Sequence, residues 1–292
     1  MDRIEAPPRA RSRIDLFALF WAAPALIWQG LFFVAPLGFL VWMSFWVVQN
    51  FRLVPDFVTD NWTRMFTRGF FHDAFWYTVQ ISAVTAVVAT LLAFPVAYYL
   101  AFCASVRRRQ LAIFLLITPF FTSYLVRVYA WTIILAREGV VNTVLGGIGI
   151  DPITLLNTSF ATIVGYLTLS LPLVILIQLL ALSNVDRDLV GAAHNLGCTP
   201  LKTVFTVVIP AAKIGLVIAG TFAFLMAFGD YVSPVFLGGS RPPTLSILIV
   251  DQAKSGNHWP RAAVVAVVMI ITLVTVLFTA LTLAYKTGRR PS

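Results

Sequence analysis

Long apolar runs separated by short polar segments dominate the chain. About 20 helical residues, rising roughly 1.5 Å each, cross a hydrocarbon core roughly 30 Å thick. Several runs contain proline, which membrane helices tolerate because neighbouring groups satisfy the freed backbone. The pattern predicts an all-α membrane protein with kinked transmembrane helices. Six spans are predicted, at residues 17–47, 76–104, 110–136, 158–182, 213–238 and 261–284.

The polar segments predict a simple domain organisation. Residues 1–15 read as a basic tail, residues 16–286 as one transmembrane domain, and residues 287–292 as a second tail. The first apolar run is too long for a signal-peptide core, and no small-residue cleavage site ends it, so we expect it to stay as an anchor. The longest polar loop lies between spans four and five, at about 183–212.

The composition supports a lipid environment. Of 292 residues, 59% are hydrophobic and 11% are charged, whereas about a quarter of the residues in soluble domains are charged. The formal net charge of +9 would suit nucleic acid in a soluble protein. Here the basic residues lie at helix ends, without the aromatic-interleaved basic face that nucleic acid requires. We expect membrane lipid as a partner and no nucleic acid.

The basic residues also predict orientation. With the N-terminus in the cytoplasm, thirteen Lys and Arg residues fall in cytoplasmic segments and seven in outer segments, while Arg127 lies within a span. Positive charge concentrates on the cytoplasmic side of membrane proteins. The prediction is a multi-pass protein of the bacterial inner membrane, with both termini and the loop at 183–212 in the cytoplasm.

A short helix is predicted within this loop. Asp186 is a favourable N-cap, and Asp188 adds negative charge to the first turn. Gly197 is a favourable stop, followed shortly by Pro200. Small and apolar residues at spacings of three and four share one face, which suits docking because small side chains allow close approach. These residues are Leu189, Ala192, Ala193 and Leu196.

The loop resembles the cytoplasmic motif of type I ABC importer permeases, which begins Glu-Ala-Ala and continues to a Gly and a Pro. The matching residues are Ala192, Ala193, Gly197 and Pro210, while Gly191 replaces the Glu. The resemblance implies the MetI-like fold, with a coupling helix between spans four and five that docks on an ATPase subunit. The Gly191 departure leaves the contact at that position open, and Asp188, one turn earlier, could partly replace the missing charge.

Further stretches are similar to the first permease subunit of spermidine/putrescine importers. They lie at residues 119–131, 229–234, 237–239 and 258–260. The resemblance implies a subunit that forms half of the pathway for a polyamine or related organic cation. It also implies an ABC ATPase dimer, a second homologous permease and an extracytoplasmic binding protein as partners. Another solute, such as an opine or an amino-acid derivative, stays an alternative.

Two ionisable residues, Arg127 and Asp230, fall within predicted spans. Charge inside a bilayer is costly and usually faces a cavity or a partner. Counted from the cytoplasmic ends of their spans, both lie toward the outer side, so we expect them to line the outer pathway, paired with each other. Tyr124, Trp131 and Tyr231 could offer ring faces to ammonium groups. The alternatives are a structural salt bridge and an interfacial aromatic belt.

Several signatures are missing from the sequence. No Gly-x-x-x-x-Gly-Lys-Ser/Thr phosphate loop occurs, so we expect ATP to be bound and hydrolysed by a separate subunit. We predict no enzyme activity, no catalytic residues, no metal site and no cofactor for this chain. An ion-coupled secondary transporter would need ionisable sites near the membrane midplane, and an intramembrane enzyme would need convergent His, Asp or Glu residues. Both stay as weaker alternatives.

Overall fold

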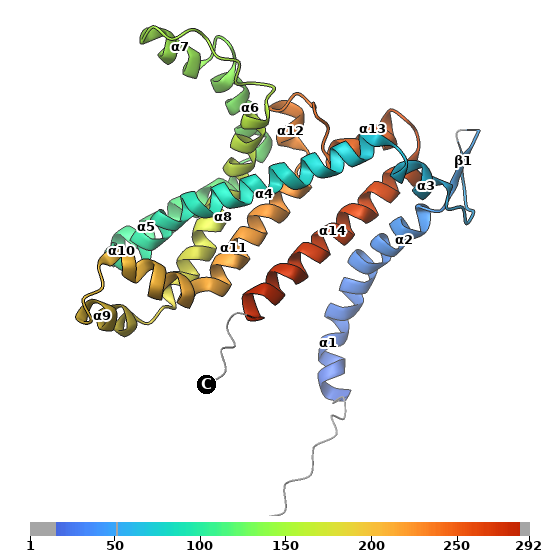
Figure 1. The fold of residues 1–292 in the computed structure, drawn as a ribbon. Coiled ribbons are helices and arrows are strands. Elements are labelled where there is room, and N and C mark those ends of the chain that lie inside the picture. Colours follow the sequence, from blue (N-terminus) through green and yellow to red (C-terminus); the bar gives the residue numbers. More distant parts are fainter. Residues whose placement is uncertain (1–15, 51, 287–292) are drawn as a thin grey trace, which may run out of the picture.

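The computed structural model describes residues 16–50 and 52–286, which are mostly helical (Figure 1). Five continuous stretches are long and apolar enough to cross a membrane. Two further helices, Val106–Phe121 and Tyr124–Gly147, meet at 94° and make a sixth crossing if the bent pair is counted as one span. The predicted tails, 1–15 and 287–292, lie outside the described residues. The five stretches are Phe20–Met43, Gly69–Cys103, Ser159–Ser183, Pro200–Gly229 and Trp259–Lys286.

The elements follow one another with short connections. Three π-helical segments, η1, η2 and η4, and one 3-10 segment, η3, interrupt the α-helices. In chain order the elements are α1 (Leu16–Gln29), η1 (Gly30–Val34), α2 (Ala35–Met43), β1 (Val47–Gln49), β2 (Arg52–Val54), α3 (Asp60–Phe66), α4 (Gly69–Tyr98), η2 (Tyr99–Cys103), α5 (Val106–Ile117), η3 (Thr118–Phe121), α6 (Tyr124–Leu135), α7 (Val140–Gly147), α8 (Ser159–Ser183), α9 (Arg187–Asn195), α10 (Pro200–Thr203), η4 (Val204–Val208), α11 (Ile209–Gly229), α12 (Val232–Phe236), α13 (Leu245–Lys254) and α14 (Trp259–Lys286).

Helices α4, α8 and α11 pack together as the centre of the bundle. Their contact surfaces are rich in alanine, including Ala89, Ala93 and Ala219, which are fully buried. Gly215 of α11 faces Ala181 of α8 so closely that a Cβ atom there would overlap the alanine methyl. Small residues let membrane helices approach closely, because packing rather than hydrophobicity drives their association.

The predicted third span, 110–136, is wrong as a single straight helix. The helical path stops near Pro119, which has no N–H to donate, and the chain turns at Thr122 and Ser123 before α6 begins. The Thr122 hydroxyl donates to the Pro119 carbonyl at 2.9 Å, which closes the turn. Helix α6 therefore leaves in a new direction, and its depth cannot be counted along α5.

The predicted fifth span, 213–238, is displaced. The helix begins earlier, at Pro200, because the Thr199 side chain caps it, and it ends at Gly229, immediately before Asp230. Pro210 does not break it. In the preceding π-helical segment the Ile209 N–H bonds to the Val204 carbonyl, so the path continues past the residue that lacks an N–H.

A two-stranded antiparallel ribbon, β1–β2, replaces the end of the predicted first span, 17–47. Val47 pairs with Val54 and Gln49 with Arg52. The ribbon lies with α3, α7, α12 and α13 at one end of the molecule (Figure 1). Helix α9, the start of α1 and the end of α14 lie toward the opposite end, which agrees with an even number of crossings.

Candidate functional site

Helix α9 is the short helix expected between spans four and five. The Asp186 carboxylate caps it by accepting the Asp188 N–H at 2.9 Å, and Asp188 adds negative charge to the first turn. The helix stands outside the main bundle and packs against α10 and η4 (Figure 1).

The end of α9 is equally well defined. Gly197 has a φ of +79°, a conformation that favours glycine. The Cys198 N–H bonds to the Ala193 carbonyl at 3.0 Å, and the Gly197 N–H bonds to the His194 carbonyl at 2.9 Å. This pair of bonds is a Schellman motif, so the chain turns away from α9 at the glycine that the sequence indicated.

The face predicted for docking is divided in two by the fold. Ala193 is buried, with 7% of its surface exposed, and turns toward the protein. Ala192 is exposed, and so are Leu189 and Leu196, at 51% and 85%. Leu201 in α10 and Phe205 in η4 are also exposed and apolar. Exposed apolar side chains are therefore present on α9 and on both elements that it packs against.

The two remaining motif residues are Gly191, inside α9, and Pro210, at the start of α11. Gly191 is exposed, and a Cβ atom built on it would meet nothing within 4 Å. The Glu found here in the resembled motif would thus fit this backbone without a clash. Pro210 is exposed in the first turn of α11, after η4.

Two arginines that the sequence reading overlooked connect the loop to the spans. Arg187 donates from Nη2 to the Ala101 carbonyl at 3.2 Å, at the end of the second span. Arg109 donates to the Ser183 hydroxyl at 2.6 Å, joining α5 to the end of α8. The Arg187 hydrogen bond therefore joins the start of α9 to the end of the second span.

At the other end of the molecule, Asp230 organises a buried polar cluster. Only 8% of its surface is exposed. Oδ1 accepts the Val232 N–H at 2.9 Å, while Oδ2 accepts the Ser233 N–H at 3.1 Å and the Tyr124 hydroxyl at 2.5 Å. The Tyr124 and Ser233 hydroxyls also share a hydrogen bond. The carboxylate is thus already satisfied by the chain's own donors and attaches α6 to α12.

Arg127 binds elsewhere, so the expected pairing with Asp230 does not occur. Its Nη1 donates to the Thr168 carbonyl at 3.2 Å, and its guanidinium lies 5.7 Å from the ring centre of Tyr124. Its Nε is buried and has no hydrogen-bond partner among the described residues. Since Tyr124 contacts both residues, Arg127 and Asp230 are neighbours but not an ion pair.

The other aromatic candidates differ in accessibility. Trp131 packs beside the buried residues Val128, Leu135 and Leu237. Tyr231 is partly exposed at the end of α11. Of these two rings, that of Tyr231 is the more accessible to a passing solute.

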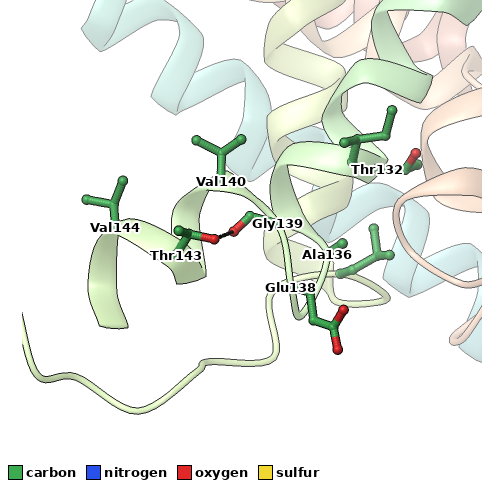
Figure 2. A pocket seen from close by; sticks show the side chains of 9 residues that line it. Thr132, Ala136, Glu138, Gly139, Val140, Thr143 and Val144 are labelled. Carbon is green, nitrogen blue, oxygen red and sulfur yellow. Dashed lines mark hydrogen bonds between the residues drawn. The ribbon is translucent and has the colours of Figure 1, made fainter. Parts of the chain in front are cut away.

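A hollow of about 640 Å³ lies between α6 and α7. It is mainly apolar, and Figure 2 shows Thr143 donating to the Gly139 carbonyl along one side, at 3.0 Å. None of the predicted pathway residues lines it. The lining residues are Thr132, Ile133, Ala136, Glu138, Gly139, Val140, Thr143, Val144 and Leu156.

Comparison with curated proteins finds permeases. The chain is 27% identical to the inner membrane ABC transporter permease protein YdcU of Escherichia coli K12, over 85% of this chain and 83% of the relative. It is 27% identical to the spermidine/putrescine transport system permease protein PotB of Haemophilus influenzae, over 79% and 80%. PotB of Escherichia coli K12 is 26% identical, over 84% and 90%. No family model matches the sequence.

Solved structures share the fold. A bacterial ABC transporter that imports the acidic polysaccharide alginate aligns with a TM-score of 0.74 at 15% identity, covering 94% of this chain and 97% of the other. The MetNI methionine ABC transporter aligns with a TM-score of 0.56 at 18% identity, covering 78% and 98%. The resemblance first seen in the loop around α9 is confirmed: the chain has the fold of type I ABC importer permeases and is homologous to ABC transporter permease subunits.

Proposed function

We propose that this chain is the permease subunit of an ATP-driven importer and forms half of its translocation pathway. The observation that carries the proposal is α9, a capped helix that presents an exposed apolar face and is connected to the second span through Arg187. Such a helix can receive the motion of a docked ATPase and pass it to the membrane. ATP is bound and hydrolysed by that separate subunit, and the chain itself carries no cofactor.

The proposed assembly contains an ABC ATPase dimer, a second homologous permease and an extracytoplasmic binding protein. One solved relative is the bacterial alginate transporter in complex with a periplasmic protein that holds an alginate pentasaccharide, which supports a binding-protein partner here. In this assembly α9 and both termini lie in the cytoplasm, and the bundle lies in the bacterial inner membrane.

The proposed solute is a polyamine or a related organic cation. Two relatives that cover about four-fifths of the chain are named as spermidine/putrescine permeases. Tyr231 is accessible for a cation–π contact with an ammonium group. The shape of the outer pathway also depends on Tyr124, Trp131 and Asp230, because their side chains hold α6 against α12 and α8.

A second solute class is favoured by the charges at this site. The Asp230 carboxylate is occupied by three donors, while Arg127 keeps an unpartnered Nε. A solute that carries an anionic group beside its amine, such as an opine or another amino-acid derivative, would find Arg127 favourable. Half of this chain also aligns, at 26% identity, with half of a Salmonella typhi protein named as a putative 2-aminoethylphosphonate transport system permease, PhnU.

Reconstitution tests both solute classes in one assay. The chain is co-expressed with the ATPase, the second permease and the binding protein of its own transport system, and the complex is purified into proteoliposomes. ATP-dependent uptake of labelled spermidine and of a labelled amino-acid derivative is then measured. Uptake of spermidine alone supports the polyamine assignment, uptake of the amino-acid derivative alone supports the second class, and uptake without the ATPase contradicts the importer.

A further inference from the structure

Three arginines converge at the end of the molecule opposite α9. Arg64 lies on α3, Arg68 immediately precedes α4, and Arg261 lies in the first turn of α14. All three line one narrow hollow, together with Met65, Phe70 and Gln252. Segments nearly 200 residues apart in sequence thus bring three guanidinium groups to one place.

Within the described residues these positive charges are poorly neutralised. Arg64 forms an ion pair with Asp60, with Nε and Oδ2 2.7 Å apart. Neither Arg68 nor Arg261 has a carboxylate within ion-pair distance in that part of the chain. Arg68 lies 5.8 Å from the ring centre of Phe70, and the Nε of Arg261 is buried without a hydrogen-bond partner. A buried charged donor without an acceptor is costly.

The backbone adds positive potential at the same point. Helix α4 has 30 residues and α14 has 28, and both begin beside the hollow. Neither has an acidic residue in its first turn. Helix N-termini carry partial positive charge that favours anions. Two helix ends and three guanidinium groups therefore act in the same direction.

The same excess of positive charge affects a neighbouring histidine. His258, just before α14, has its pKa lowered first by burial and then by the charges of Arg261, Arg64 and Arg68. The neutral form of His258 is therefore favoured beside the cluster.

The position favours a ligand at the level of the lipid headgroups. Trp259 and Phe70 are exposed beside the cluster, at the N-terminal ends of the sixth and second spans. Aromatic side chains mark the interface between hydrocarbon and water. An acidic surface of a protein would have to approach this level from outside, whereas a phospholipid already places its phosphate there.

We propose that Arg68 and Arg261, assisted by Arg64, bind a phosphate group at the outer ends of α4 and α14. Guanidinium groups match phosphate oxygens with paired donors. The hollow is too narrow to admit even a water-sized group, so the phosphate lies over its mouth, against the guanidinium groups that border it. The phosphate can belong to an anionic phospholipid or to a free phosphate ion.

Lipid retention by the intact transporter complex tests the site. Complexes with the wild-type chain, an Arg68→Gln/Arg261→Gln variant and an Arg52→Gln/Arg137→Gln control are prepared in nanodiscs of phosphatidylglycerol and phosphatidylcholine. Arg52 and Arg137 are exposed and lie outside the cluster. Native mass spectrometry counts the retained phosphatidylglycerol. In parallel, Tm is measured in neutral detergent with added inorganic phosphate.

We expect the cluster variant to bind phosphatidylglycerol about tenfold more weakly or worse, as for the loss of a charge-assisted hydrogen bond, while the control resembles wild type. An Arg-dependent rise of Tm with inorganic phosphate alone assigns a free phosphate ion instead of a lipid. Equal retention and equal Tm in all three complexes would overturn the proposal. The proposal would also be overturned if the cluster variant retained phosphatidylglycerol normally and lost only its contact with the binding protein. Arg68→Gln alone, at an exposed position, serves if the double variant fails to fold.

Discussion

Arg127 donates a hydrogen bond to the carbonyl oxygen of Thr168 across the gap between α6 and α8, at 3.2 Å. In a regular helix that carbonyl would accept the N–H of residue 172, four positions later. Residue 172 is a proline inside α8 and has no N–H. The guanidinium thus supplies the donor that the helix lacks, and a cation within the membrane region has a structural reason to be there.

This relationship predicts that the cost of removing Arg127 depends on Pro172. Arg127→Ala leaves the Thr168 carbonyl without a donor, which should destabilise the protein by about 1–3 kcal/mol. In a Pro172→Ala background the restored N–H satisfies the carbonyl, so the same substitution should cost much less. Thermal unfolding of the four proteins in detergent gives the double-mutant cycle.

The cycle also separates structure from transport. If Arg127 acts only as this donor, the double variant regains uptake together with stability. If stability returns and uptake does not, Arg127 has a second role toward the solute, as the unpartnered Nε allows. Equal costs of Arg127→Ala in both backgrounds would show that the Thr168 contact does not explain the arginine.

The sequence predicted the coupling helix well because all of its determinants are local. The Asp186 cap, the Gly197 stop and the spacing of apolar residues lie within a dozen positions and act through the backbone nearby. Which side of α9 would be buried could not be predicted, because the burial of Ala193 depends on how α9 packs against α10 and η4.

The outer site was predicted less accurately, for a physical reason. The predicted depths of Arg127 and Asp230 in the membrane assume straight helices. In the structure, α5 and α6 meet at 94°, and α11 stops before Asp230. Arg127 contacts the backbone carbonyl of Thr168 and the ring of Tyr124. Neither partner can be identified from the pattern of charged residues in the sequence. The available signal was Pro172, whose position identifies Thr168 as a carbonyl in need of a donor.

The exposed apolar face of α9 predicts a separation of ATP hydrolysis from transport. Leu196→Glu places a charge on a residue that is 85% exposed, so the permease itself should fold normally. Docking of an apolar surface should weaken, and uptake should fall several-fold relative to ATPase activity. Asn195→Glu, one residue away and also exposed, adds the same charge without removing apolar surface and serves as the control. Equal uptake by the two variants would contradict docking through Leu196.

Close packing of α8 and α11 predicts that position 215 tolerates no larger side chain. Gly215→Val would push a side chain into Ala181, where even a Cβ atom overlaps, and overpacking of this kind costs about 1–3 kcal/mol. Gly38→Val in α2 is the matched control, because a Cβ atom there meets nothing within 4 Å. Fluorescence-detected size-exclusion chromatography after a heating series compares the two, and an unchanged Tm for Gly215→Val would contradict the packing.

The arginine cluster predicts how His258 titrates. Its pKa in the folded protein is lowered by burial and by Arg261, Arg64 and Arg68, so the unfolded chain binds the proton more readily. The resulting contribution to stability is complete above the ordinary histidine pKa of about 6.5 and is lost as the pH falls from that value through the lower pKa of the folded protein. Arg68→Gln/Arg261→Gln should raise the pKa of His258 only partway to its ordinary value, because burial is the larger cause. NMR of histidine-labelled protein follows this titration. A bound phosphate should raise the same pKa in the wild-type protein, since it neutralises the arginines, and should not do so in the variant. If phosphatidylglycerol shifts His258 equally in both proteins, the lipid acts on the histidine without the cluster.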